Sequence, residues 1–199
     1  KIDPIADIET ISLELIFSDI EAVNKRMERV SKQVKAGDKK AAIELELLNK
    51  VLKHLENGKP VRTLNLEIEE QEILKETYLL TSKPTIYVAN VSESQIENME
   101  NDPFVLKVKE YAKNENAQVV TLCAKLEEDL SELDEDDQLL LMQDYGIEES
   151  GLDKLIKASY HLLGLISYLT AGKQEVRAWT ITKGTKAPQA AGKIHSDFE

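Results

Sequence analysis

The sequence lacks several features that mark common protein classes. Cys123 is the only cysteine among 199 residues, so an internal disulfide is impossible and a reducing compartment is consistent. No apolar run approaches the length of about 18 residues that spans a bilayer, and residues 1–4 lack the apolar stretch of a signal peptide. With 42% hydrophobic and 31% charged residues the chain can form a packed core, and we expect a cytoplasmic protein of one or two domains.

Metal-binding patterns are absent too. The histidines His54, His161 and His195 lie in separate segments without metal-ligand spacing, which favours surface or structural roles over a metal site. Eight of the eleven residues in 127–137 are acidic, but this run has no EF-hand spacing and no central glycine. An apolar leucine stripe continues through it, so the sequence predicts a solvated amphipathic helix followed by an acidic turn. We expect no metal ligands.

The clearest physical signal lies in the first sixty residues. Apolar residues recur there at alternating steps of three and four, and the pattern repeats after a break at Gly37-Asp38. Gly37 suits the end of one helix and Asp38 the N-cap of the next, so the link permits only an antiparallel turn. The sequence predicts an antiparallel α-hairpin coiled coil; dimerisation through the seam is the alternative. The predicted seam residues are Ile16, Ile20, Val23, Met27, Val30, Val34, Ala41, Leu45, Leu48, Leu52 and Leu55.

Charge along this hairpin is uneven. The whole chain has a net charge of −12, yet seven basic residues against two acidic ones fall within residues 25–40, around the predicted tip. A projecting basic end is suited to contact phosphates, whereas the simpler interpretation is a solvated surface whose lysines complement the helix dipole. No aromatic residue lies between these side chains, which argues against base stacking at the tip. The basic residues are Lys25, Arg26, Arg29, Lys32, Lys35, Lys39 and Lys40.

A short β run at residues 84–90 delivers Asn90 and Glu93 into the loop that follows it. Its strand propensity is high, Pro84 suits the first position, and the run ends at polar residues. Ligands of doubly wound sheets bind at the carboxyl ends of strands, so this loop is a candidate ligand loop; an ordinary strand-to-loop transition is the alternative.

The rest of the chain follows an α/β pattern. The sequence predicts a helix over 66–80, another that begins at Asp102-Pro103, and a second apolar strand over 117–123. This arrangement is typical of the closing half of a doubly wound sheet. Further along we expect a helix ending near Gly146, a helix over 152–163, a β-hairpin formed by 165–170 and 175–182, and a helix that begins within 188–194.

Several of these segments together resemble one family. They are Asn90-Val-Ser-Glu93, the loop 58–62, Cys123-Ala-Lys125, the segment 151–156, Thr170-Ala-Gly172, Val176-Arg-Ala-Trp-Thr-Ile181 and residues 184–192. The chain resembles the YchF type of Obg-like ATPase over essentially all of its length, and the last two segments are the most specific part.

The resemblance implies three regions and a fold. Residues 1–63 would form the antiparallel coiled-coil domain, residues 64–165 the C-terminal half of the nucleotide-binding domain, and residues 166–199 the start of a TGS domain. The fold class is therefore α/β with a helical insertion, the distal half of a P-loop NTPase sheet, and a partial β-grasp segment. No Gly-x-x-x-x-Gly-Lys-Ser/Thr motif occurs here, so we expect the phosphate and Mg²⁺ groups to belong to a longer protein of which this chain is a piece.

The resemblance also implies the site residues. In GTP-binding proteins the first loop reads Asn-Lys-x-Asp, and the aspartate accepts from guanine's two N–H donors. Here Val91 replaces the lysine and Glu93 the aspartate, which should weaken guanine preference. Adenine presents an acceptor where guanine presents donors, so a carboxylate held there would face a lone pair, and Glu93 would hold the loop or disfavour guanine. Asn90 would hydrogen-bond the purine, and Val91 would pack on it. The second loop, commonly Ser-Ala-Lys, matches as Cys123, Ala124 and Lys125, with cysteine in place of the hydroxyl. Cys123 is expected to be a buried small residue rather than a redox switch.

The expected function is that of a ribosome-associated protein that binds and hydrolyses ATP, or ATP and GTP, with Mg²⁺. This chain would supply base recognition and partner contacts, would be inactive without the P-loop, and would hold none of the catalytic residues. We expect a monomer that contacts ribosomal RNA and no membrane. Two alternatives remain: a non-catalytic adaptor that binds ribosomal RNA, and a coiled-coil scaffold that dimerises.

Overall fold

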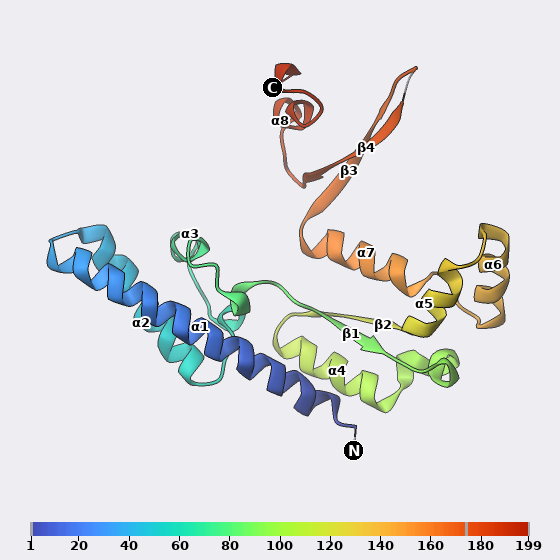
Figure 1. Cartoon of the computed structure of the whole chain (residues 1–199), viewed down its shortest axis with the longest axis horizontal. Coiled ribbons are helices and arrows are strands. Elements are labelled where there is room, and N and C mark those ends of the chain that lie inside the picture. The colour runs from blue at the N-terminus through green and yellow to red at the C-terminus, as the bar shows by residue number, and fades with distance from the viewer. Residues whose placement is uncertain (1, 174, 199) are drawn as a thin grey trace. The chain divides into compact units, whose positions relative to one another are not determined.

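The computed structural model describes residues 2–173 and 175–198. They divide into two compact units: Lys1–Tyr87 with Asn101–Val119, and Val88–Glu100 with Val120–Glu199. The first unit holds the N-terminal helices and the second holds the candidate ligand loops, so each is described by itself. Figure 1 labels the α-helices and strands of both units.

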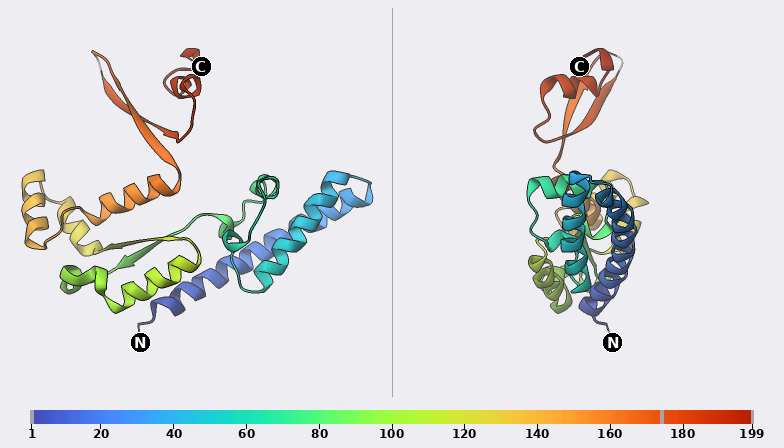
Figure 2. Two further views of the ribbon diagram at one scale, coloured as in Figure 1. Left: turned by 180° about the vertical axis from the view of Figure 1, so that it is seen from behind. Right: turned by 90° about the vertical axis from the view of Figure 1, so that its left-hand side faces the viewer.

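A helical hairpin dominates the first unit. Helix α1 (Pro4–Lys35) and helix α2 (Lys39–Glu56) run antiparallel and lie side by side in both views of Figure 2. Gly37 takes a left-handed φ of +90° at the turn, and the Asp38 carboxylate accepts hydrogen bonds from the backbone N–H groups of Lys40 and Ala41 at 2.8 and 3.2 Å. The predicted turn, with its glycine and its N-cap, is confirmed.

The hairpin core follows the predicted seam. Every seam residue is either buried or packed against the buried cluster, and Leu47 and Val51 of α2 join them. These two were missed because they lie beside the three-four repeat on a wider apolar face, which a helix needs when it packs against more than one neighbour.

A buried carboxylate attaches the hairpin to the segment before the first strand. Asp19 of α1 has 2% of its surface exposed and accepts hydrogen bonds from the backbone N–H groups of Leu80 and Thr81, both at 2.8 Å. These two residues begin the 3-10 turn η2 (Leu80–Ser82). The Thr81 hydroxyl in turn accepts from the Val61 N–H at 3.0 Å, in the turn η1 (Val61–Thr63).

The helix predicted over 66–80 is wrong in its length. Helix α3 covers only Ile68–Lys75, with a capping box formed by Glu67 and Glu70. The chain then turns at Tyr78, whose φ of +52° is left-handed and incompatible with a helix. Burial of Leu79 and the Asp19 contacts hold the next residues in another direction, which periodicity alone does not report.

Two strands form the first sheet: β1 (Ile86–Asn90) pairs with β2 (Gln118–Leu122). Between them the chain passes through the 3-10 segment η3 (Glu93–Asn101) and helix α4 (Pro103–Asn114). Asp102 caps α4 and Pro103 is its first residue, as predicted. Both strands and the intervening helix agree with the expected α/β pattern.

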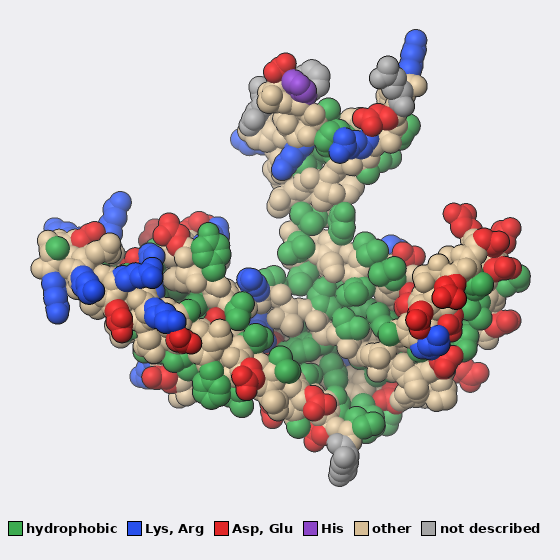
Figure 3. Space-filling view, in the orientation of Figure 1, with side chains coloured by type: hydrophobic (Ala, Val, Ile, Leu, Met, Phe, Trp, Pro, Cys, Tyr) green, Lys and Arg blue, Asp and Glu red, His purple; other side chains and the backbone are tan. Residues whose placement is uncertain are grey.

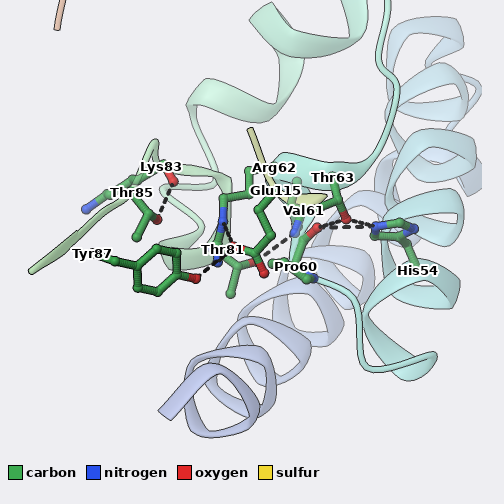
Figure 4. A network of polar contacts seen from close by, with 10 residues as sticks. All are labelled: His54, Pro60, Val61, Arg62, Thr63, Thr81, Lys83, Thr85, Tyr87 and Glu115. Carbon is green, nitrogen blue, oxygen red and sulfur yellow. Dashed lines mark hydrogen bonds and ion pairs between the residues drawn. The ribbon is translucent and has the colours of Figure 1, made fainter. Parts of the chain in front are cut away.

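A polar network in the first unit holds the start of β1, as Figure 4 shows. One carboxylate oxygen of Glu115 accepts from Arg62 Nε and Nη2 at 3.0 and 2.6 Å and from the Tyr87 hydroxyl at 2.9 Å. On the other side of η1, the His54 ring lies 2.9 Å from the Thr63 hydroxyl. The loop 58–62 is thus a structural junction between α2, α4 and β1.

The second unit continues with three helices and a hairpin. Helices α5 (Ala124–Ser131) and α6 (Glu135–Asp144) carry the acidic run, and α7 (Gly151–Leu162) leads into β3 (Leu165–Ala171). Strand β3 pairs antiparallel with β4 (Val176–Thr182), so the predicted β-hairpin is confirmed. Helix α8 (Ala187–Gly192) and the turn η4 (Ser196–Phe198) follow.

Candidate functional site

The two predicted ligand loops meet at the carboxyl ends of β1 and β2. The Asn90 Oδ1 atom accepts a hydrogen bond from the Ala124 backbone N–H at 2.9 Å, although 34 positions separate the two residues. The Val91 N–H donates to the Leu122 carbonyl, also at 2.9 Å. The loops that the sequence identified separately are therefore joined by one side-chain bond and one backbone bond.

The bond from Ala124 fixes which part of the Asn90 amide is available. With Oδ1 used as an acceptor inside the protein, the amide Nδ2 is the group that can act outward, and it is a donor only. Asn90 is exposed. The loop therefore presents a fixed hydrogen-bond donor at the end of β1.

The other residues of the first loop take different positions. Val91 is buried, with 8% of its surface exposed, while Glu93 is exposed at the start of η3. Between them, the Ser92 hydroxyl and N–H both donate to the Gln95 side-chain oxygen, at 2.7 and 2.9 Å. This local network orders the loop, and the small exposed area of Val91 limits how much of it a base could cover.

The second loop is the N-terminus of α5. The Cys123 side chain is buried, with 4% exposed, and stands at the N-cap without a side-chain capping bond. Lys125 is exposed and pairs with Glu128 and Asp129 at 3.1 and 2.9 Å. Its hydrogen bonds to these carboxylates raise the Lys125 pKa, Asp129 first. Cys123 can offer a ligand its backbone, and Lys125 is directed toward its own helix.

Sequence reasoning missed a contact that joins α5 to α7. The Glu127 carboxylate accepts from the backbone N–H groups of Gly151 and Leu152, at 2.7 and 3.0 Å, and so caps the N-terminus of α7. Glu127 belongs to the acidic run 127–137, and nothing in the local pattern separates it from its solvated neighbours. Only the fold brings it to a helix terminus 24 residues away.

The second predicted set, the basic residues of residues 25–40, gathers at the hairpin tip, where Figure 3 shows lysine and arginine side chains clustered at the end of α1 and α2. Arg26 pairs with Glu44 at 2.6 Å and Glu76 at 3.6 Å, and its bond to Glu44 raises its pKa. Lys25 pairs with Glu21. Within the described part of the chain no ion pair involves the other five, which are all exposed: Arg29, Lys32, Lys35, Lys39 and Lys40.

Two absences concern the described residues alone. In residues 2–173 and 175–198 no three histidine, cysteine or carboxylate side chains converge into a metal-binding group. No helix in the same ranges combines the length and apolarity needed to cross a bilayer.

Comparison with known proteins finds relatives that align with the whole length of the chain. The chain is 53% identical over 199 residues to the ribosome-binding ATPase YchF of Bacillus subtilis, and 47% identical to the protein of that name from Escherichia coli O157:H7. It also matches the solved structure of the Schizosaccharomyces pombe YchF GTPase with a TM-score of 0.88 and 35% identity. The chain belongs to the YchF family.

Each match covers a larger share of this chain than of the protein it is aligned with. All of this chain is aligned in each case, but it spans 54% of the length of the bacterial relatives and of the fission-yeast chain. The YchF-GTPase_C family model, described as "Protein of unknown function (DUF933)", matches residues 165–199. The YchF membership thus rests on the whole chain, and the family model adds independent support for its last segment.

Proposed function

We propose that this chain is the base-reading and partner-binding part of a YchF-type protein that binds and hydrolyses ATP, with GTP as a weaker or equal substrate. The Asn90–Ala124 hydrogen bond carries the proposal. It joins the two loops that read the base in the family the chain resembles, and it leaves the Nδ2 donor of an exposed residue for a ligand. Mg²⁺ and the phosphates would be held by groups outside these 199 residues.

The donor fits a purine. N7 is an acceptor in both adenine and guanine, so a bond from Asn90 Nδ2 to N7 would hold either base. Selection between them would depend on Glu93, whose carboxylate suits guanine's donors less closely than the shorter aspartate would. Val91 would contribute its small exposed edge, and Cys123, Ala124 and Lys125 would contribute backbone and helix-terminus contacts rather than side-chain bonds.

An exposed apolar stripe on α7 supports the placement in a larger nucleotide-binding domain. Leu152, Ile156, Tyr160 and Leu163 are all exposed, although they recur at the helical steps typical of a packed face. In this proposal the stripe packs on the part of the domain that the longer relatives contain. The coiled-coil character of residues 1–63 and the TGS character of residues 166–199 belong to the same proposal.

Asn90→Asp tests the base-reading role in the full-length protein. Aspartate retains an oxygen that accepts from the Ala124 N–H, but it replaces the outward donor by an acceptor. ATP and GTP affinity should both fall about tenfold or more, because a lost hydrogen bond to a purine leaves two acceptors facing each other. Glu97→Gln changes an exposed side chain of η3, just after the same loop; it is the matched control and should bind as the unchanged protein does. Equal nucleotide affinity in Asn90→Asp would reject the assignment.

Ribosome association would use the basic hairpin tip. Reversal of four unpaired lysines, Lys32, Lys35, Lys39 and Lys40, to glutamate should abolish co-sedimentation with ribosomes, because phosphate contacts dominate affinity for RNA. The matched control makes the same change of net charge away from the tip, at Lys53, Lys59, Lys83 and Lys113. Equal loss in both variants would indicate a general charge effect and remove the tip from the interface.

The non-catalytic adaptor and the dimeric scaffold give different results. An adaptor would bind ribosomes through the tip without any effect of ATP or of Asn90→Asp. A scaffold would have the mass of a dimer in solution, and a monomeric mass would exclude it.

A further inference from the structure

The β3–β4 hairpin carries an arginine stacked on the only tryptophan of the chain. The Arg177 guanidinium carbon lies 4.3 Å from the centroid of the Trp179 ring. The Trp179 Nε1–H donates to the Thr170 hydroxyl at 2.9 Å, which fixes the ring against the neighbouring strand. The guanidinium and the indole are therefore held together by contacts within the hairpin.

Register shows how this face is organised. Tyr168 lies opposite Trp179, and Thr170 opposite Arg177, so all four side chains share one face of the hairpin. Ile181, near the C-terminal end of β4, is buried. The Tyr168 hydroxyl donates to the Ala190 carbonyl of α8 at 2.5 Å. Burial of this face decreases toward the N-terminal end of β4: Ile181 is buried, Trp179 is half-buried and Arg177 is exposed. The outer end of the face is open.

Charge on this segment is opposite to that of the chain. Residues 165–199 contain five lysines and arginines against three carboxylates, while the whole chain has a net charge of −12. Glu175 is exposed two positions before Arg177, yet no carboxylate of the described residues forms an ion pair with Arg177. Its five N–H donors are thus oriented by an aromatic ring and not neutralised by an acid.

We propose that Arg177 and Trp179 form a stacking platform for an unpaired base of single-stranded RNA. A guanidinium plane held on an indole can stack on a base with one face and donate to the adjoining phosphate from its edge. Double-stranded RNA fits less well, because its base faces are stacked inside the duplex. An acidic peptide would pair with the charge of Arg177 but would not stack on the planar groups. This inference deepens the proposed function, since it rests on a ribosome-associated role and names the RNA element that the segment recognises.

Intrinsic fluorescence tests the platform directly, because Trp179 is the only tryptophan. A short unstructured RNA oligonucleotide is titrated into the 199-residue chain at low salt. Saturable quenching of the tryptophan emission is expected, and the affinity should fall as salt is raised. Arg177→Lys keeps the charge but removes the plane, and should weaken binding about tenfold.

A control variant and two control ligands complete the design. Val176→Thr lies on the opposite face of the hairpin, since Val176 pairs with Ala171, and should bind RNA as the unchanged chain does. A blunt RNA duplex and an acidic peptide should quench little. The proposal is overturned if single-stranded RNA leaves the emission unchanged, if Arg177→Lys binds equally well, or if duplex or peptide quenches as strongly. If the platform fails while the tip reversal still abolishes ribosome binding, the proposed function stands without it.

Discussion

At the residue scale, the buried carboxylate of Asp19 shows how much a single side chain can hold together. It accepts two backbone N–H groups from a segment 61 and 62 positions away. Asp19→Ala would leave the N–H of buried Thr81 and the partly buried N–H of Leu80 without this partner, and we expect a loss of about 2–4 kcal/mol in the free energy of unfolding. Urea denaturation followed by circular dichroism measures it. Glu14→Gln changes an exposed carboxylate on the same helix and should cost less than about 0.5 kcal/mol.

The environment of Tyr87 should make the stability of the fold depend on pH at high pH. Burial first, and then the hydrogen bond to Glu115, raise its pKa to about 12. Because the folded pKa lies above the value near 10 of an unfolded tyrosine, this stabilisation is complete below about pH 10 and is lost as the pH rises through about 12. Burial also raises the pKa of Tyr111, so ultraviolet difference titration should show a late phenolate step that Tyr87→Phe reduces by one tyrosine. A titration in which Tyr87→Phe leaves the late step intact would contradict the assignment.

The sequence identified the residues of the candidate site better than their contacts. Strand propensity located the ends of the two strands correctly, and the family resemblance pointed to Asn90 and Cys123-Ala-Lys125 there. The bond from Ala124 to Asn90 was not predictable, because it joins positions 34 apart and depends on strand pairing. Burial of Val91 was missed for the same reason: a valine after a strand can face either the core or the solvent.

At the scale of the element, the start of α7 is packed too closely for any side chain larger than hydrogen. A Cβ atom at Gly151 would lie 2.4 Å from the Leu122 Cβ and 2.9 Å from the Glu127 Oε1. Gly151→Ala must displace α7 from β2 and from its carboxylate cap, and should cost about 1–3 kcal/mol. Thermal denaturation measures the loss. Gly172→Ala, where the nearest described atom lies 3.6 Å away, is the control, and equal shifts in the two variants would contradict the packing argument.

The bounds of a helix were predicted well where its own sequence pattern determines them, and poorly where contacts with distant residues determine them. The hairpin seam needed only the three-four repeat, and α4 needed only Asp102 and Pro103. By contrast, the residues after Lys75 have apolar spacing that continues a helix, but Tyr78 adopts a left-handed backbone as Leu79 enters the core and Asp19 binds the next two N–H groups. Tertiary contacts override local periodicity there.

At the scale of the whole molecule, catalysis should depend on residues beyond these 199. The chain contains no Gly-x-x-x-x-Gly-Lys-Ser/Thr sequence, so nothing in it would cradle the phosphates. We expect no release of inorganic phosphate from ATP or GTP by this chain alone, and release by the full-length protein under the same conditions. A phosphate-release assay on matched preparations measures both, and hydrolysis by the chain alone would show that the phosphate site had been misassigned.

The opposite signs of charge on the hairpin tip and on the chain as a whole have a kinetic consequence. A polyanion that approaches the acidic surface is repelled, whereas one that meets residues 25–40 is attracted, so long-range forces select among collisions before any contact forms. Encounters in which residues 25–40 face the polyanion would therefore be favoured, and those through acidic surface would be few. Added salt would screen both the attraction to residues 25–40 and the repulsion by the acidic surface. The association rate and the preference for one orientation would therefore decline together.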